Sequence, residues 1–285
     1  MFYLQIKIMI VNFLKNLRHK KLKNFPNFWF FLGNFYRKIL IKTKYSVTCR
    51  KNISNFGPFN FHPIFLFSDF DNWGRNHNNL YRKMITMGLK KKCIIDIGTH
   101  IGLNIIPIGV ISSGKVEIHC FEPSDVNLSY LRYHIENNGI KNIVINNLVV
   151  GSKARQKVVF YEKEVTSGLN SILKLENKGH FDEKYKIQTS LDHYCFKKNI
   201  VPELIKIDAE GSEIEILMGS KKIIKKYKPI IFLSLHPFHI KKLGNKIKDL
   251  KLILKEIDYD IFDKSNAKPK NFKLDEYLLV PKNVK

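Results

Sequence analysis

The chain has 285 residues, of which 44% are hydrophobic and 26% are charged. This apolar share excludes a disordered tail protein, and the length fits one large domain with an appendage. The 49 lysines and arginines outnumber the 25 acidic residues, which gives a formal net charge of +24. Such a charge ordinarily indicates an anionic partner, either nucleic acid or a membrane surface.

The excess charge is concentrated at the N-terminus. Residues 1–68 contain 12 lysines and arginines and no acidic residue, whereas residues 93–236 contain 19 basic and 16 acidic side chains. Only seven of the basic residues are arginine, the side chain that reads phosphates and base edges through its planar fork. These observations argue against nucleic acid and divide the chain into a basic, aromatic N-terminal extension, residues 1–68, and a domain over residues 69–285.

The start of the extension mixes apolar and basic side chains. Lys7 interrupts its first apolar run and Lys15 follows it, which is the reverse of the charge order in a secretory signal. Neither this run nor Phe28–Tyr36 supplies the roughly 20 apolar residues of a spanning helix. Two interpretations stay open, a basic amphipathic segment lying on an anionic membrane and a packing helix with a solvated face.

The cysteine pattern bears on the compartment. The four cysteines lie far apart without any CxxC spacing, so zinc and disulfide frameworks are not indicated. We therefore expect a reduced, cytoplasmic protein. From the basic extension we expect peripheral contact to the inner face of a membrane through residues 1–68. The cysteines are Cys49, Cys93, Cys120 and Cys195.

From about residue 92, short apolar β-branched runs alternate with longer amphipathic stretches. This alternation predicts an α/β fold with a mostly parallel sheet and helices on both faces. The predicted strands are Cys93–Ile97, Val116–Phe121, Asn142–Val149, Leu204–Ile207 and Ile230–Leu235. Apolar residues at spacings of three and four predict helices over Ser124–Asn138 and Gly211–Tyr227.

An insert separates the third and fourth of these strands. Lys157–Tyr161 and Lys184–Thr189 have the pattern of strands, and a short helix is predicted from about Asp192. The polar loop between the two strands contains Thr166, Ser167, Asn170 and Ser171, which either line an acceptor pocket or are simply solvated. At the end of the chain, Tyr259–Phe262 and Glu276–Val280 are predicted to pair as an antiparallel hairpin.

A glycine turn follows the first predicted strand of the sheet. Gly98 and Gly102 allow the backbone to approach a ligand closely at the carboxyl end of a parallel strand, where open α/β sheets bind ligands. Asp96 precedes the turn, and the glycines are four apart. This is neither the dinucleotide GxGxxG spacing nor a Walker loop, so the pattern favours a cofactor whose charged end is not a phosphate.

Glu122 ends the next predicted strand and is followed by a proline. A carboxylate at this position can accept hydrogen bonds from both hydroxyls of a ribose. Together with the glycine turn it predicts a site for an adenosine-type ligand without phosphates, and S-adenosylmethionine fits that description.

These motifs resemble those of the FkbM-like methyltransferases, a branch of the class I S-adenosylmethionine-dependent fold. Five motifs occur in the family's order, and the resemblance covers about half of the chain, from about Cys93 to Pro237. They are Asp96-Ile-Gly98-Thr99-His100-Ile-Gly102, Phe121-Glu122-Pro123, Thr189-Ser190-Leu191-Asp192, Lys206-Ile-Asp208-Ala-Glu210-Gly211-Ser-Glu213 and Pro229-Ile-Ile-Phe-Leu-Ser-Leu-His236. Thr99 stands where Ala is usual and His100 where Asn is common.

The resemblance implies S-adenosyl-L-methionine as the cofactor. The residues at the cofactor-binding positions are Asp96, Gly98, His100, Gly102 and Glu122. It also implies that the methyl acceptor faces the tip of the fourth predicted strand.

Three residues are the candidates for catalysis there, Asp208, Glu210 and His236. A carboxylate at this tip can orient or deprotonate a hydroxyl, and no nucleophilic side chain is needed because the sulfonium is itself the electrophile. Favourable interaction with a helix N-terminus also explains carboxylates at this point, above all for Glu213. His236 beside Asp208 fits a general-base pair, hard ligands for a metal, or a purely structural histidine, and we assign no metal.

The function expected from the resemblance is transfer of a methyl group to an oxygen, a hydroxyl of a glycan or glycolipid precursor. Two rivals stay open. A nucleic-acid methyltransferase would explain the charge, but the Asn-Pro-Pro-Tyr and Pro-Cys elements of such enzymes are missing. A membrane-docked binding protein of a glycan assembly system that has lost catalysis would explain the basic start of the chain. Trp73, His77 and Asn78, which precede the first predicted strand of the sheet, are candidates for a lid over the cofactor.

Overall fold

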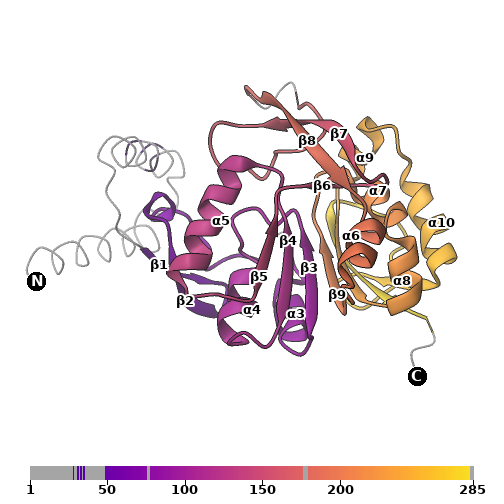
Figure 1. The fold of residues 1–285 in the computed structure, drawn as a ribbon, viewed down its shortest axis with the longest axis horizontal. Helices are drawn as coiled ribbons and strands as arrows, with labels where there is room; N and C mark the ends of the chain where they lie inside the picture. The colour runs from indigo at the N-terminus through magenta and orange to yellow at the C-terminus, as the bar shows by residue number, and fades with distance from the viewer. Residues whose placement is uncertain are drawn as a thin grey trace, which may run out of the picture.

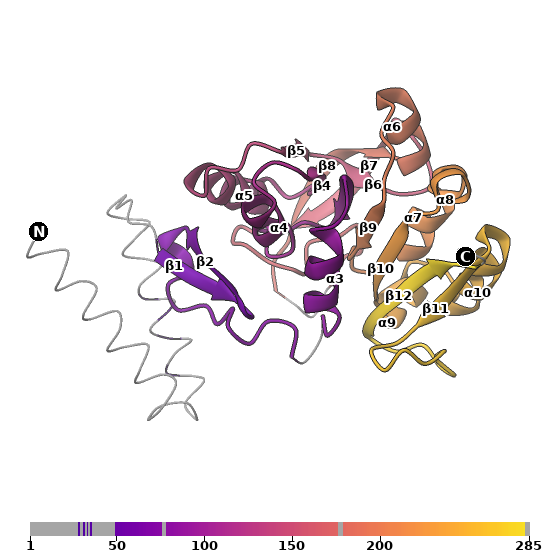
Figure 2. The same ribbon diagram turned by 90° about the horizontal axis from the view of Figure 1, so that it is seen from below.

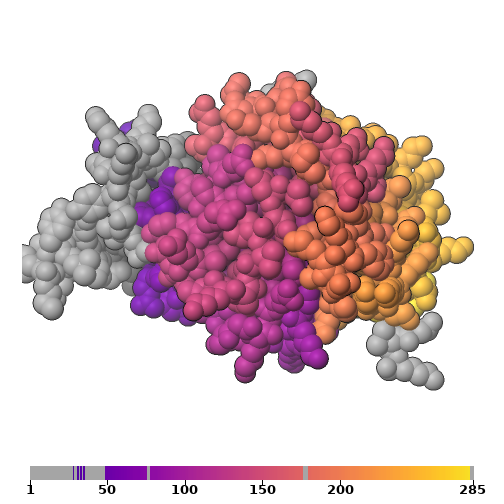
Figure 3. Space-filling view, in the orientation of Figure 1, coloured from indigo at the N-terminus to yellow at the C-terminus, as the bar shows by residue number. Residues whose placement is uncertain are grey.

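The computed structural model describes residues 28, 31, 33, 35, 49–75, 78–175 and 179–282. Its centre is a seven-stranded sheet in which the N-terminal and C-terminal halves of the chain lie side by side (Figures 1 and 3). In spatial order the strands are β11 (Tyr259–Phe262), β12 (Asp275–Pro281), β10 (Ile230–Leu235), β9 (Leu204–Ile207), β3 (Cys93–Ile97), β4 (Glu117–Phe121) and β5 (Ile143–Asn146).

The five strands from β10 to β5 are mutually parallel, so their carboxyl ends meet at one edge of the sheet. The pairings of Ile97 with Phe121 and with Ile207 bring the ends of β4, β3 and β9 to one level. β12 runs antiparallel to both β10 and β11, which confirms the predicted terminal hairpin. The prediction of a class I methyltransferase-like α/β fold is confirmed.

Alternation along the buried strands gives the sheet two apolar faces. Ile94 packs into one core with α3 (Tyr81–Gly88), α4 (Ile105–Ile111) and α5 (Asp125–Asn137). Ile95 packs into the other core, which is covered by helices from the second half of the chain (Figure 2). These are α6 (Leu191–Lys198), α7 (Glu213–Met218), α8 (Lys221–Tyr227), α9 (Pro237–Lys242) and α10 (Ile247–Ile257).

Two predicted elements are divided in the structure. The stretch predicted as one strand, Asn142–Val149, ends as β5 at Asn146 and resumes as β6 (Val149–Val150), which pairs with a different sheet. The predicted helix Gly211–Tyr227 is divided into α7 and α8 at Gly219, whose Cβ would lie 2.1 Å from the carbonyl oxygen of Gly151. The close approach of the β6 loop therefore leaves room only for glycine at that break.

The insert forms a second, three-stranded sheet. β7 (Gln156–Glu162) and β8 (Asp182–Thr189) contain the two strands predicted there and pair antiparallel, with β6 alongside β8. Figure 1 shows this pair crossing one end of the central sheet. The polar loop of the insert is thereby held near the carboxyl ends of the parallel strands.

Part of the predicted N-terminal extension is built into the domain. β1 (Cys49–Ile53) and β2 (Phe56–Phe61) form a hairpin whose Phe61 ring lies 4.4 Å from the ring of His134 on α5. A 3-10 helix, Pro63–Phe65, follows it, and the Phe65 ring lies 5.2 Å from that of Tyr130. Membrane contact was predicted for residues 1–68, of which residues 1–48 lie almost wholly outside the described part of the chain. Among the described residues, no helix combines the length and apolar character needed to span a bilayer.

Candidate functional site

A cavity of about 660 Å³ opens at the carboxyl ends of β3, β4, β9 and β10. Its turn end is formed by Gly98, His100 and Glu122, and its carboxylate end by Asp208, Glu210 and His236. Trp73 and Asn78, the predicted lid residues, also line it, whereas His77 lies outside the described residues. Apolar walls come from side chains that include Phe121, Leu148, Val150, Phe160 and Leu169.

The glycine turn brings the tips of two strands into contact. Gly98 has a φ of +77°, and a Cβ at this position would lie 1.8 Å from the carbonyl oxygen of Asp208. Only glycine fits there, so the requirement is set by the β9 tip as much as by a ligand. His100, also in the left-handed region with a φ of +55°, lines the cavity, and burial lowers its pKa to about 4. Its ring is therefore neutral.

Glu122 is 4% exposed and stands at the turn end. One carboxylate oxygen accepts a hydrogen bond from the backbone N–H of His100 at 2.7 Å. The other accepts hydrogen bonds from the backbone N–H of Ser124 at 2.9 Å and from the side-chain amide of Asn127 at 3.3 Å. Burial raises its pKa to about 7, against these donors. Because a carboxylate has about four acceptor positions, Glu122 keeps capacity for a hydroxyl donor from the cavity.

Two of the predicted cofactor-binding residues do not line the cavity. Gly102 has a φ of +94°, and a Cβ there would lie 2.7 Å from the Leu131 side chain, so this glycine serves packing against α5. Asp96 is 1% exposed, and neither of its carboxylate oxygens has a hydrogen-bond partner among the described residues. Burial raises its pKa to about 7, although Lys206 acts in the opposite direction.

A row of buried polar side chains, not foreseen from the sequence, supports the carboxylate end. Lys206 Nζ lies 2.9 Å from Glu276 Oε1 and 3.5 Å from Asp208 Oδ2, and it also donates to the Ser234 hydroxyl. Burial alone would lower the pKa of Lys206, but Glu276 and Asp208 outweigh it and raise that pKa. In the sequence, a lysine within the apolar run Leu204–Ile207 was the feature that could have indicated this buried ion pair. Its partner Glu276 lies 70 positions away on β12, and no local pattern connects the two.

The three predicted catalytic residues are brought together. His236 Nε2 lies 3.4 Å from Glu210 Oε1 and 3.8 Å from Asp208 Oδ1. Its other nitrogen, Nδ1, donates to Glu213 Oε1 at 2.9 Å, and Glu213 is fully buried. His239 extends the group, with its ring stacked on that of His236 at 5.8 Å.

Charge interactions dominate this end of the cavity. Burial alone would lower the pKa of His236, but Glu210, Glu213 and Asp208 raise it to about 11. Burial alone would raise the pKa of Asp208, but Lys206 and His236 lower it. In this arrangement both ring nitrogens of His236 carry a proton and the ring is a cation. A general base needs an unprotonated nitrogen, so His236 does not meet that requirement.

The polar loop of the insert reaches the turn end. Thr166 Oγ1 lies 3.2 Å from His100 Nε2 and donates to Asn127 Oδ1 at 3.0 Å, while Asn170 donates to the Ser124 hydroxyl at 3.2 Å. Three of the four predicted loop residues line the cavity, Ser167, Asn170 and Ser171. Thr166 instead fixes the loop to the turn.

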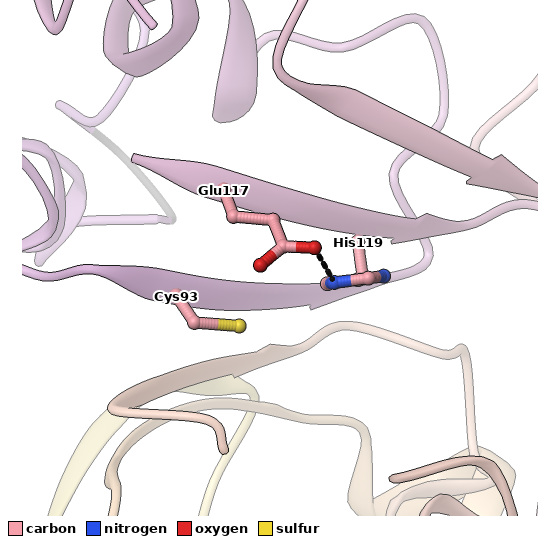
Figure 4. Close-up of side chains that lie close together, drawn as sticks. All are labelled: Cys93, Glu117 and His119. Carbon is pink, nitrogen blue, oxygen red and sulfur yellow. Dashed lines mark hydrogen bonds and ion pairs between the residues drawn. The ribbon is translucent and has the colours of Figure 1, made fainter. Parts of the chain in front are cut away.

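A second group of side chains lies at the opposite ends of two of these strands (Figure 4). Cys93 begins β3 and Glu117 begins β4, and the Glu117 carboxylate lies 3.0 Å from His119 Nε2. His119 Nδ1 lies 2.8 Å from the Tyr194 hydroxyl, so both ring nitrogens have partners. Burial raises the pKa of the Cys93 thiol to about 12, so the thiol is protonated at neutral pH.

Comparison with solved structures found relatives of low identity. The FkbM methyltransferase of Methylobacillus flagellatus KT is 19% identical, with a TM-score of 0.43, over 76% of this chain and 54% of that one. This chain therefore spans about half the length of that protein. M. jannaschii TYW2, solved with AdoMet, is 10% identical with a TM-score of 0.40, over 83% and 85% of the two chains.

The comparison with curated proteins found no match. The family model for the methyltransferase FkbM domain, in contrast, matches residues 96–261, more than half of the chain. This range includes the glycine turn, Glu122, and all three residues of the carboxylate end. The chain belongs to the FkbM methyltransferase family.

Proposed function

We propose that the protein binds S-adenosylmethionine at the turn end of the cavity and methylates a hydroxyl of a glycan or glycolipid precursor at the carboxylate end. The observation that carries this proposal is a single cavity with a hydroxyl-binding carboxylate, Glu122, at one end and the Asp208, Glu210 and His236 group at the other.

The residues of the turn end fit such a cofactor. A volume of about 660 Å³ falls in the range of small-molecule pockets, roughly 300–1,000 Å³. Glu122 would hold the ribose hydroxyls, since its oxygens are already oriented by His100 and Ser124 and retain acceptor capacity. The apolar walls suit the base and the aliphatic stem. When bound, the cofactor supplies an electrophilic methyl group on a sulfonium.

The carboxylate end supplies what a hydroxyl acceptor requires. Methylation of a hydroxyl releases its proton, and Asp208 and Glu210 are carboxylates at this end of the cavity that can accept a hydrogen bond from that hydroxyl. His236, held as a cation by its carboxylate neighbours, orients them rather than taking the proton itself. A wall with acidic, imidazole, amide and hydroxyl groups matches an acceptor rich in hydroxyls.

The N-terminal extension supports a proposal about location. We propose that the acid-free, basic residues 1–48 bring the protein to the anionic inner face of a membrane, where lipid-linked glycan precursors are available. The near balance of charge over residues 93–236 weighs against a phosphate backbone as the substrate.

Cofactor binding is tested by isothermal titration of the full-length protein with S-adenosylmethionine. A hydrogen bond to a charged group contributes about 1.5–3 kcal/mol, so Glu122→Ala should weaken binding by about 10–100-fold. Glu117→Ala, at the other end of the same strand, is the matched control and should bind like the parent protein. Unchanged affinity in a folded Glu122→Ala protein contradicts the assignment.

The acceptor class is tested by radiolabel transfer. The full-length protein and labelled S-adenosylmethionine are incubated with a cell extract, which is then separated into glycan, lipid, RNA and protein pools. Label in the glycan or lipid-linked glycan pool, lost with Asp208→Asn, is expected. Label confined to RNA or protein contradicts the proposed acceptor.

A further inference from the structure

The carboxylate end of the cavity has the geometry of a cation site. Asp208, Glu210 and His236 each offer one ligand atom, and these three atoms lie within 4.8 Å of one another. They come from the tip of β9, the turn after it and the tip of β10. We propose that this group binds a first-row divalent metal ion, with Asp208 Oδ1, Glu210 Oε1 and His236 Nε2 as its protein ligands.

The orientation of His236 supports this proposal. Its Nδ1–H donates to Glu213 Oε1 at 2.9 Å, which fixes the ring so that Nε2 faces Asp208 and Glu210. A metal-binding histidine almost always donates its other ring N–H to a carboxylate or carbonyl in this way. Glu213 has no access to the solvent, and its second oxygen, Oε2, has no hydrogen-bond partner among the described residues. Glu213 Oε1 also accepts the backbone N–H of Gly211 at 3.0 Å, so this carboxylate fixes both the ring and the turn after β9.

The spacing of the ligand atoms is also that of a shared ion. Nitrogen and oxygen ligands about 2.0–2.2 Å from one metal, at angles near 90–110°, lie about 3.0–3.5 Å apart. Nε2 is 3.4 Å from Glu210 Oε1 and 3.8 Å from Asp208 Oδ1, long for hydrogen bonds but close to this range.

The charge balance favours a cation at the same point. The carboxylates of Asp208, Glu210 and Glu213 all lie within 4 Å of the His236 ring. Lys206, on the strand that ends at Asp208, lies 2.9 Å from the buried Glu276 and 3.5 Å from Asp208 Oδ2, the oxygen that is not proposed as a ligand. Metal binding requires an unprotonated Nε2, so the ion takes the place of the proton there and gives the carboxylates a divalent partner.

The donor set indicates the type of metal. Two carboxylate oxygens suit Mg²⁺, Ca²⁺ and Mn²⁺, whereas an imidazole nitrogen suits first-row transition metals, and Mn²⁺ satisfies both. All three ligands line the cavity, so the remaining coordination positions face the methyl acceptor. The role of the ion, binding an acceptor hydroxyl and lowering its pKa, rests on the proposed function, but the binding of the ion does not.

The test is a calorimetric titration of full-length protein, dialysed against a chelator, with MnCl₂ in the absence of S-adenosylmethionine. One Mn²⁺ per chain is expected, with affinity at least tenfold above that for Mg²⁺. Glu210→Gln, which keeps the shape of the side chain, and His236→Ala should each weaken Mn²⁺ binding at least tenfold. Circular dichroism melting identifies a variant that fails to fold, in which case Glu213→Gln serves as the second variant, with a loss of about 10–100-fold expected.

Glu117→Gln is the control, because it alters the Cys93, Glu117 and His119 group at the far end of the sheet. No Mn²⁺ binding, or binding lost in Glu117→Gln and retained in His236→Ala, overturns the proposal. Separate titration with S-adenosylmethionine distinguishes this failure from that of the proposed function. Glu122→Ala should lose the cofactor and keep the metal, whereas His236→Ala should do the reverse.

Discussion

Two buried carboxyl groups near the turn end, Asp96 and Glu122, show how local surroundings separate residues of the same type. Burial raises the pKa of both to about 7. Glu122 has three hydrogen-bond donors and faces the cavity, whereas the Asp96 carboxylate has no hydrogen-bond partner among the described residues and does not line the cavity. Glu122 is thus prepared for a ligand, while the ionised form of Asp96 is a cost to the folded state.

That cost predicts a pH dependence of stability. The native state protonates Asp96 at a pKa of about 7 and the unfolded state at about 4, so between these values the native state binds more protons. The stabilising contribution is complete below pH 4 and is lost as the pH rises through 7. Asparagine does not ionise, so the Asp96→Asn protein should not show this loss. As the pH rises from 5 to 8, the unfolding free energy of the parent protein should fall by about 2 kcal/mol relative to that of Asp96→Asn.

Urea unfolding followed by circular dichroism at the two pH values measures this difference. Asp71→Asn, at an exposed position, is the matched control and should show the same pH dependence as the parent protein. If Asp96→Asn also follows the parent protein, Asp96 is not a burden on the folded state.

At the residue scale, the sequence predicted which side chains reach the strand tips but not what surrounds them. Asp208, Glu210 and His236 follow apolar strands, and their meeting was predictable because parallel strands end at one edge. The buried partners Glu213 and Glu276 could not be assigned, since the first reads as a helix N-terminal residue and the second belongs to a distant hairpin. The packing role of Gly102 depends on Leu131 in α5, which no local pattern reveals.

At the scale of elements, the β1–β2 hairpin changes the extent of the folded domain. Its Phe61 is fully buried, and the ring lies 5.2 Å from that of Phe70 and 4.4 Å from that of His134. The hairpin is also hydrogen-bonded to the end of α5. The backbone N–H of Asn60 donates to Asn138 Oδ1 at 2.8 Å, and the Asn138 side-chain amide donates to the Asn60 carbonyl at 2.7 Å. Residues 49–65 thus contribute to the core that supports α5, although their composition resembles that of the basic start of the chain.

Removal of one aromatic ring from this hairpin should be costly. Truncation of a fully buried phenylalanine to alanine costs about 3–5 kcal/mol, and we expect this for Phe61→Ala. Phe196→Ala, at a position 40% exposed on α6, is the control and should cost less than about 1 kcal/mol. Urea unfolding measures the loss of unfolding free energy in both variants. A loss in Phe61→Ala as small as the one expected for Phe196→Ala would mean that the hairpin contributes little to the fold.

The elements that were predicted and those that were missed differ in the range of their determining contacts. β3, β9 and β10 have the predicted bounds because continuous apolar runs of that length are typical of buried parallel strands. α10 was missed although Leu250, Ile253, Leu254 and Ile257 follow helical spacing, so its signal was present. The division of α7 from α8 depends on Gly151 in a loop far along the chain, and periodicity alone could not predict it.

At the scale of the whole molecule, much of the charge and the cavity belong to different parts of the chain. The family match over residues 96–261 covers the nearly balanced part, whereas 10 of the 12 basic residues of the acid-free stretch 1–68 precede β1. The proposed attraction of residues 1–48 to an anionic surface therefore does not involve the residues of the cavity. Under this proposal, the +24 charge concerns the location of the protein rather than its methyl acceptor.

Vesicle co-sedimentation tests this separation. Each lysine near an anionic membrane contributes about 1 kcal/mol, so replacing Lys20, Lys21 and Lys23 with Gln should weaken binding to phosphatidylserine vesicles by about tenfold or more. The same replacement at Lys90, Lys91 and Lys92 removes equal charge from the loop before β3 and is the matched control. Equal loss in both proteins would indicate a response to net charge alone, and strong binding to neutral vesicles would contradict an electrostatic contact.

The contact between Gly98 and Asp208 has a consequence for how this protein can diversify. With 1.8 Å between a Cβ at Gly98 and the backbone carbonyl oxygen of Asp208, no side chain can replace the glycine without displacing the tip of β9. New acceptor preferences are then expected from segments that line the cavity without belonging to this contact, such as the insert loop at residues 167–172. Randomised libraries aimed at altered specificity are best confined to that loop, because Glu276, which also lines the cavity, is the buried ion partner of Lys206.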